Sequence, residues 1–308
     1  LNIYQEIATE EFLNNNLSQS ENFCNLGLAH ITNLLDQVNL SEILMKIKSS
    51  QNYPQKALNI GLNFLDQLNI NLVHFPLNIN LIDQQQETKN ITIEEQISLR
   101  ILINLLRPAT IISPQLIPAI VNTIIKLSPY PQNPHFATVA YSYYGTFLCN
   151  KGAKIETAYR LGKISLRLVK RFNLQENKCK INQNFYGIIA PWKMLIQKTL
   201  IPLKETIKKG LEIGDLEGIG ITASLYCQNL FLSGHPLTEI TQEYQEYLEL
   251  MQQLNLNYYY EELKIWNQLL MKFQKKDNSS INFESNSNYS NPAFLFFNYF
   301  IQSIFYYY

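Results

Sequence analysis

The residues best suited to chemistry in this 308-residue chain are scattered along the sequence and do not form a recognisable group. No two histidines fall at the i, i+4 spacing that places two metal ligands on one helix face, and no CxxC pair occurs. The histidines are His30, His74, His135 and His235. This pattern predicts no metal-binding residues.

The cysteines are equally far apart and sit among apolar residues at helical spacing; they are Cys24, Cys149, Cys179 and Cys227. Cys149 and Cys227 each lie a few residues before a glycine that closes a predicted helix, so we interpret them as small packing residues. Buried free thiols are typical of a reducing compartment, and the sequence shows no secretory signal. We therefore expect a cytoplasmic protein.

Glycines cluster at Gly210, Gly214, Gly218 and Gly220, but Glu212, Asp215 and Glu217 lie between them. A phosphate-binding loop does not place negative charge there, so these glycines indicate a helix end and close helix packing. Neither G-x-x-x-x-G-K-[ST] nor G-x-S-x-G occurs. Adjacent carboxylates at Glu10–Glu11, Glu94–Glu95 and Glu261–Glu262 are expected near helix starts, where the helix dipole favours them. We predict no catalytic and no cofactor-binding residues, and no cofactor.

Two basic clusters could instead meet an acidic partner or a phosphorylated segment. The alternative is a solvated helix face with cations towards its C-terminal end. The clusters are Arg160, Lys163, Arg167, Lys170 and Arg171, and Lys204, Lys208 and Lys209. With 25 basic and 25 acidic residues, the formal net charge is zero, so we expect no nucleic-acid partner. Tyr258–Tyr260 near Trp266 is then expected to serve core packing and capping.

The elements that would position these residues are helices, organised around residues 144–173. Two helices meet there at a turn formed by Lys151 and Gly152. Gly145 allows close approach of the paired backbones, and the second helix carries an apolar stripe at Ala158, Leu161, Ile164 or Ser165, and Leu168. This spacing is typical of a tetratricopeptide-like (TPR-like) hairpin, which needs neighbours on both sides to bury its apolar face.

The rest of the chain follows the same plan, because apolar residues recur three and four apart and strand-like alternation is nearly absent. Turns at residues 14–16 and 51–54 predict two hairpins. Thr92 and Glu95 form a capping-box pattern for a helix that we expect Pro108 to end. The predicted divisions are N-terminal hairpins at 1–73, a loop at 74–91, central repeats at 92–274, a polar flexible loop at 275–291 and a truncated terminal helix at 292–308.

Three stretches, residues 106–121, 141–173 and 191–240, resemble one family in content and order. This family is the large multidomain signalling kinase of cyanobacteria, which joins a serine/threonine kinase domain, a P-loop ATPase module, helical repeats, a GAF sensor and a histidine kinase. The chain is similar to the helical-repeat region, which lies between the ATPase and the GAF and histidine-kinase parts. It departs from the family where Pro191-Trp192-Lys193 replaces His-Trp-Lys and where Lys151-Gly152 replaces Gly-Asp.

We therefore predict an all-α superhelix of antiparallel helix pairs, a TPR-like solenoid with a concave surface. The resemblance implies a non-catalytic scaffold or regulatory segment of a two-component signal-transduction kinase. Its partners would be neighbouring kinase or ATPase domains, or a peptide on the concave face. The alternatives are a stand-alone peptide-binding adaptor and a remnant fragment of such a gene.

Because the sequence starts at Leu1 and stops within an aromatic run at Tyr308, we expect a piece of a longer protein, with self-association through an uncapped terminal repeat. The terminal run is too short to span a membrane and is expected to form either a buried repeat helix or a membrane-surface helix.

Overall fold

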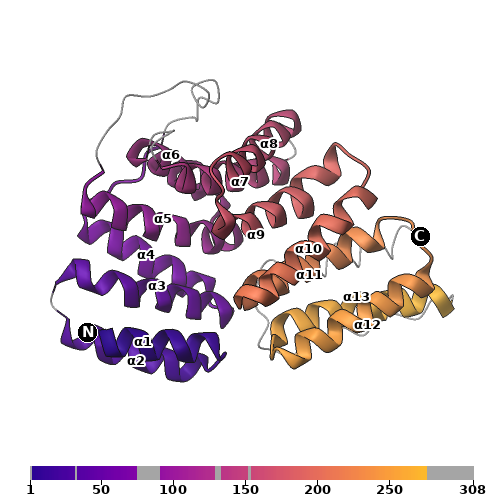
Figure 1. Ribbon diagram of the computed structural model, residues 1–308, viewed down its shortest axis with the longest axis horizontal. Coiled ribbons are helices and arrows are strands. Elements are labelled where there is room, and N and C mark those ends of the chain that lie inside the picture. Colours follow the sequence, from indigo (N-terminus) through magenta and orange to yellow (C-terminus); the bar gives the residue numbers. More distant parts are fainter. Residues whose placement is uncertain (1, 32, 75–90, 129–132, 152–153, 276–308) are drawn as a thin grey trace.

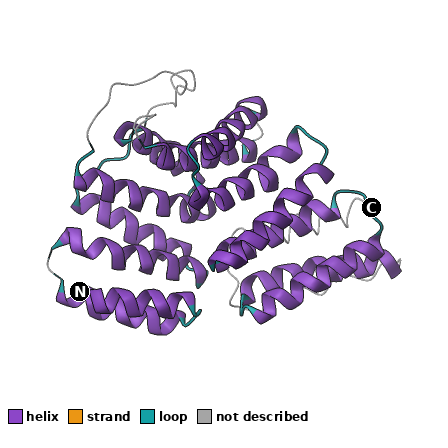
Figure 2. Cartoon of the chain, viewed as in Figure 1, coloured by secondary structure: helices purple, strands orange, loops and turns teal. Residues whose placement is uncertain are grey.

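The computed structural model describes residues 2–31, 33–74, 91–128, 133–151 and 154–275, and within them the protein is all-helical, without strands (Figures 1 and 2). The helices are α1 (Asn2–Leu13), α2 (Leu17–His30), α3 (Leu34–Ser50), α4 (Pro54–Gln67), α5 (Ile93–Ile112), α6 (Ile117–Leu127), α7 (Pro134–Asn150), α8 (Ile155–Arg171), α9 (Gln175–Asn184), α10 (Gln197–Ile213), α11 (Leu216–Phe231), α12 (Leu237–Gln253) and α13 (Asn257–Lys275). They pack in consecutive pairs along a curved array, as predicted (Figure 1).

The central hairpin confirms the predicted apolar stripe of α8. Ala158, Leu161 and Leu168 are buried against α7 and the segment that follows α9, whereas the charged residues of α8 face outwards. Gly145 allows the close approach, because a Cβ atom there would lie 3.1 Å from the backbone oxygen of Ala158. The predicted turn residue Gly152 lies outside the described residues.

A recurring helix end divides the array into hairpins. Asparagine adopts a left-handed conformation after α1, α3, α4, α8 and α12, at Asn15, Asn52, Asn69, Asn173 and Asn255. The following residue then donates its N–H to a carbonyl five residues back, as Leu256 does to Met251 at 2.8 Å. Gly214, with φ of 70°, ends α10 in the same way. Asparagine tolerates this conformation better than most residues, so it serves here where glycine is the usual choice.

The predicted helix starts are largely confirmed. Thr92 and Glu95 form the capping box of α5, and Pro54 occupies the first turn of α4. Asp215 caps α11 by accepting a hydrogen bond from the Gly218 N–H at 3.0 Å. The α-helix does not continue through Pro191, because α9 passes into a π-helical segment at Phe185–Ile189 and a 3-10 turn at Ala190–Trp192.

Two predictions about helix ends are wrong. The helix expected to stop at Pro108 continues to Ile112, because Leu105, Leu106 and Ala109 are fully buried in the core and their packing outweighs the local cost of proline. Glu10 and Glu11, expected near a helix start, lie in the last turn of α1. Residues 75–90 of the predicted loop, and all of 276–308, lie outside the described residues.

Apolar side chains form a series of cores along the array. One core joins α3–α7, with Leu99, Leu102 and Leu105 fully buried inside it, and another joins α10–α13 around Tyr244 and Trp266. A third core lies between α7, α8 and the π-helical segment, and a fourth binds α1–α3. The array therefore consists of two packed arms, α1–α6 and α10–α13, joined through α7–α9.

Candidate binding groove

The concave side of the array encloses a groove of about 1380 Å³, which we call the inner groove. Its walls include residues of α5, α7 and α9 and the turns that join α1 to α2, α3 to α4, α10 to α11 and α12 to α13. The two arms meet across its mouth, where the Asn15 side-chain amide donates to the backbone oxygens of Leu254 at 3.3 Å and Asn255 at 3.4 Å. The first and last helix pairs accordingly lie close together in Figure 1.

Three residues from three helices bind one another inside this groove, and we call them the cross-groove cluster. Arg107 of α5 places its Nε 2.5 Å from the Oε1 of Glu217 on α11. A second nitrogen of the same guanidinium donates to the Tyr259 hydroxyl of α13 at 2.7 Å. Burial alone would lower the pKa of Arg107, but Glu217 reverses the effect and holds it above its ordinary value. The cluster links the two arms through charge.

Lys180 and Tyr143 extend the polar surface next to the cluster. Burial lowers the pKa of the Lys180 ammonium, although Glu217 and Asp215 oppose this shift. Burial raises the pKa of Tyr143 to about 12, so its hydroxyl is protonated and able to donate a hydrogen bond at neutral pH. The inner groove thus presents an ammonium, a guanidinium and phenolic hydroxyls within one partly desolvated space.

Carboxamides supply much of the remaining polar lining. They come from both arms and from α9, and include Asn16, Gln51, Asn104, Gln183, Asn255 and Asn257. Each carboxamide carries two N–H donors and an oxygen acceptor. Gln51 and Asn104 already donate to Glu21 and to the Arg100 backbone oxygen, so their remaining donor and acceptor capacity is what a peptide backbone could use. The lining favours recognition of a ligand with alternating donors and acceptors.

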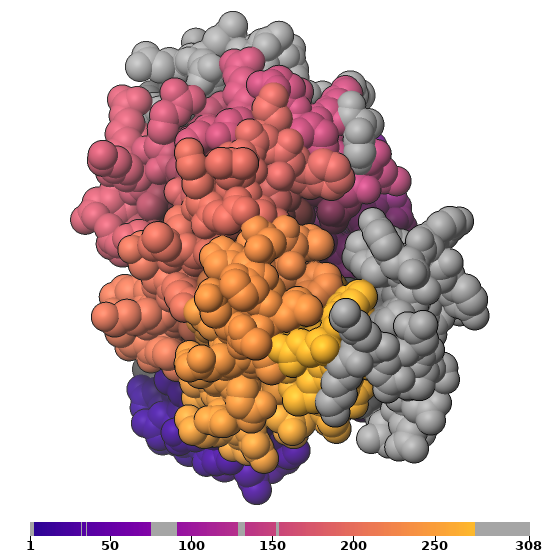
Figure 3. Space-filling view, turned by 90° about the vertical axis from the view of Figure 1, so that its right-hand side faces the viewer, coloured from indigo at the N-terminus to yellow at the C-terminus, as the bar shows by residue number. Residues whose placement is uncertain are grey.

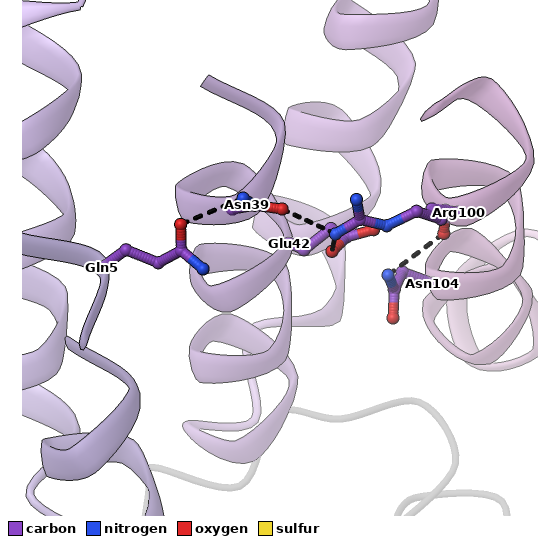
Figure 4. Close-up of polar contacts among 5 residues, drawn as sticks. All are labelled: Gln5, Asn39, Glu42, Arg100 and Asn104. Atoms are coloured by element: carbon purple, nitrogen blue, oxygen red, sulfur yellow. Dashed lines mark hydrogen bonds and ion pairs between the residues drawn. The ribbon is translucent and has the colours of Figure 1, made fainter. Parts of the chain in front are cut away.

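A second polar link lies along the N-terminal arm. Arg100 of α5 donates to the Asn39 side-chain oxygen at 2.7 Å and forms an ion pair with the largely buried Glu42, both on α3 (Figure 4). Asn39 in turn donates to the Gln5 oxygen of α1 at 3.0 Å (Figure 4). This chain of contacts connects successive layers of the arm. Asn104 of α5 lies on the groove wall, and its side-chain amide donates to the Arg100 backbone oxygen at 3.1 Å (Figure 4).

A half-buried carboxyl group, that of Glu262, lies between α11 and α13. Glu262 accepts hydrogen bonds from the Ser224 hydroxyl at 3.1 Å and the Gln228 amide at 3.3 Å. Burial raises its pKa to about 7, against the opposing effect of these two bonds and of Arg107. Its ionisation is therefore coupled to the packing of the C-terminal arm.

The residues considered for chemistry at the outset are not brought together. Among the described residues, no three of the histidine, cysteine, aspartate and glutamate side chains are placed to hold a metal ion. All four cysteines are buried and free, as predicted, and burial raises the pKa of Cys24 to about 12 and of Cys149 to about 11. His135 pairs with Glu176, its Nδ1 lying 2.7 Å from Oε1.

The other sequence candidates have mainly structural surroundings. Gly210 and Gly220 pack closely against Ile219 and Tyr259, which confirms close packing for this glycine cluster. Glu94 and Glu95 lie in the first turn of α5, as predicted. Tyr259 packs as expected, but its hydroxyl also belongs to the cross-groove cluster.

Sequence reasoning did not single out Arg107, Lys180 or Tyr143. A signal was present for Arg107, which is the only charged residue between Arg100 and Lys126. An isolated cation in an apolar run needs a partner once the run is buried. Its partners Glu217 and Tyr259 are more than a hundred residues away, and no local pattern identifies them.

None of the helices that the structure describes is long and apolar enough to cross a membrane. The sequence matches no model of a known protein family, and no curated protein matches it.

Proposed function

We propose that this chain is a non-catalytic helical-repeat scaffold that binds an extended polypeptide segment in its inner groove. The observation that carries this proposal is the carboxamide-rich lining, contributed by both arms and reaching from Asn16 to Asn257. An extended peptide exposes backbone N–H and C=O groups along its length. Carboxamides can pair with both, whatever the peptide side chains are.

The size of the groove supports a peptide over a small metabolite. Its volume of about 1380 Å³ exceeds the roughly 300–1,000 Å³ of small-molecule sites, which are usually lined by apolar residues. Lys180 and Tyr143 then offer one fixed polar anchor among adaptable contacts. Such a division between anchor and surroundings is common where one protein segment binds another.

The resemblance of residues 106–121, 141–173 and 191–240 suggests the source of that segment. In this proposal the peptide belongs to a neighbouring domain of a multidomain signalling kinase in the cytoplasm, and the array acts between the ATPase and histidine-kinase parts. Sequencing the flanking DNA tests this context. A P-loop motif upstream with GAF and histidine-kinase motifs downstream would support it, whereas stop codons close on both sides would favour a stand-alone adaptor or a remnant.

Peptide binding itself is testable without knowledge of the natural partner. Peptides would be selected from a phage-displayed random library and their dissociation constants measured by fluorescence anisotropy. The variant Ser49→Trp/Asn257→Trp places bulky side chains on the groove lining and should weaken binding at least tenfold. The matched control Asn63→Trp/Gln96→Trp, with both residues exposed and outside the groove, should bind as the parent chain does.

Hydrogen exchange would locate the contact independently. Bound peptide should protect amides at the turns that line the inner groove, including those near Asn16 and Asn257. Equal loss of binding in both tryptophan variants, or protection confined to the outer helices, would contradict the proposal.

A further inference from the structure

The exposed side of α8 forms a strongly basic stripe. Arg160, Lys163, Arg167, Lys170 and Arg171 are all exposed, and they recur at three- and four-residue spacing opposite the buried face. With five basic residues and one acidic residue, the helix has a net charge of +4. Among the described residues, none forms an ion pair with Arg167 or Lys170. We call this surface the basic face.

Helix α12 carries the complementary pattern. It has the same length of 17 residues as α8, and it contains four glutamates and no basic residue, a net charge of −4. Glu239, Glu246 and Glu249 are exposed along one side, which we call the acidic face. Glu243 lies in the same row but already binds Lys204 at 2.8 Å and the Tyr226 hydroxyl at 2.7 Å.

The two faces lie apart in the molecule. Figure 1 places α8 at the top and α12 at the lower right, and they belong to different apolar cores. In Figure 3 the orange residues of α12 form part of the outer surface of the C-terminal arm. One molecule therefore presents both halves of a complementary pair on its exterior, while its total formal charge is zero.

We propose that the basic face of one molecule binds the acidic face of a second copy. The equal lengths, opposite net charges and matching spacing favour this occupant over an unrelated anion, because each copy supplies both surfaces. Such a contact is heterologous, so it joins molecules head to tail and continues into short chains or a closed ring. Exposed ion pairs contribute little individually and are screened by salt, so the association is expected to be weak and strongest at low ionic strength.

Sedimentation velocity on the full chain tests this arrangement. The mean sedimentation coefficient should rise with protein concentration in about 20 mM NaCl and lose that dependence in about 500 mM NaCl, where the screening length is far shorter. Arg167→Glu/Lys170→Glu and Glu246→Lys/Glu249→Lys should each remain monomeric alone. Mixing the two variants should restore association, because the unaltered basic face of the α12 variant can bind the unaltered acidic face of the α8 variant, and the two altered faces also carry opposite charges.

The control Lys46→Glu/Lys56→Glu changes the net charge by the same amount as the α8 variant, at exposed positions away from both faces, and should associate as the parent chain does. Circular dichroism would verify that every variant retains its helices. A parent chain that stays monomeric at low salt, or variants that associate as well as the control, would overturn the proposal. The proposal would also be overturned if the parent chain stays monomeric while Arg167 and Lys170 mediate binding to phosphatidylserine vesicles or double-stranded DNA.

Discussion

Arg100 and Arg107 lie two turns apart on α5, yet they hold together different parts of the protein. Arg100 binds Asn39 and Glu42 on α3, a layer of the same arm. Arg107 binds Glu217 and Tyr259, which belong to the opposite arm. One helix thus takes part both in the stacking of layers and in the closure of the array.

Both ion pairs are partly covered. Arg100 and Glu42 keep 38% and 12% of their side-chain exposure, and Arg107 and Glu217 keep 24% and 23%. The two contacting atoms of the cross-groove pair, Arg107 Nε and Glu217 Oε1, are themselves buried. A buried charge loses more when its partner is removed, so both pairs should contribute to stability, and the cross-groove cluster should in addition govern how the arms meet.

The largest effect is expected from Leu105→Ala, which removes a side chain from the core that α5 shares with α3, α4, α6 and α7. Leu105 is fully buried, so the change should lower the free energy of unfolding by about 2–5 kcal/mol. Chemical denaturation monitored by circular dichroism measures it. The control is Leu211→Ala, at a side chain that is 44% exposed, and it should have little effect on the free energy of unfolding. Similar losses of stability in the two variants would show that the core of the N-terminal arm is not where we place it.

Arg100→Met should lower the free energy of unfolding by about 1–3 kcal/mol, because Glu42 would remain buried without its cation. The same denaturation experiment applies. Adding Glu42→Leu should recover most of the loss, since removing both partners leaves no unpaired charge. If the double variant were less stable than the single one, the ion pair would not be the cause.

Arg107→Met should lower the free energy of unfolding by about 1–3 kcal/mol, because the Glu217 carboxylate oxygen would remain buried without its cation. Its larger consequence is a change of shape, because the arms lose their charged link and the radius of gyration from small-angle X-ray scattering should increase. Arg167→Met, on the exposed side of α8, removes the same charge and should leave both quantities unchanged in high salt. An unchanged radius in the Arg107 variant would indicate that Asn15 and the turn beside Leu254 suffice for closure.

The smallest expected effect on stability comes from the titration of Glu262. Its folded-state pKa, raised by burial from 4.5 to about 7, makes the protonated form the stable one in the folded protein. This group therefore contributes stability that is fully present below about pH 4.5 and is lost as the pH rises through about 7. Melting temperatures of the parent and of Glu262→Gln, measured across this range, should diverge in favour of the variant as the pH rises.

Arg107 favours the ionised form of Glu262, so Arg107→Met should move this pH window slightly upwards. A pH window that stays in place would mean that Arg107 and Glu262 do not interact between the two arms. A parent chain whose stability is independent of Glu262 would contradict the assigned burial.

Local features of the fold could be predicted from the sequence, whereas the contacts by which the two arms meet could not. The capping box at Thr92, the turn at Gly214–Asp215 and the stripe of α8 depend on residues a few positions apart. The helix end predicted at Pro108 was wrong because the buried leucines around it outweigh the local preference of proline to end a helix. Arg107 and Tyr259 are 152 residues apart, and such a contact leaves no periodic signal in the chain. The groove was expected only as a concave surface, without its residues.

The contact between Asn15 and Leu254 also bears on how such a protein could evolve. An open solenoid can gain or lose a repeat by duplication or deletion, because each unit touches only its neighbours. Here an added helix pair would advance every later unit and separate residues that now meet across 239 positions. Selection on this contact would hold the copy number of the helix pairs constant, so change is expected to accumulate by substitution within the units.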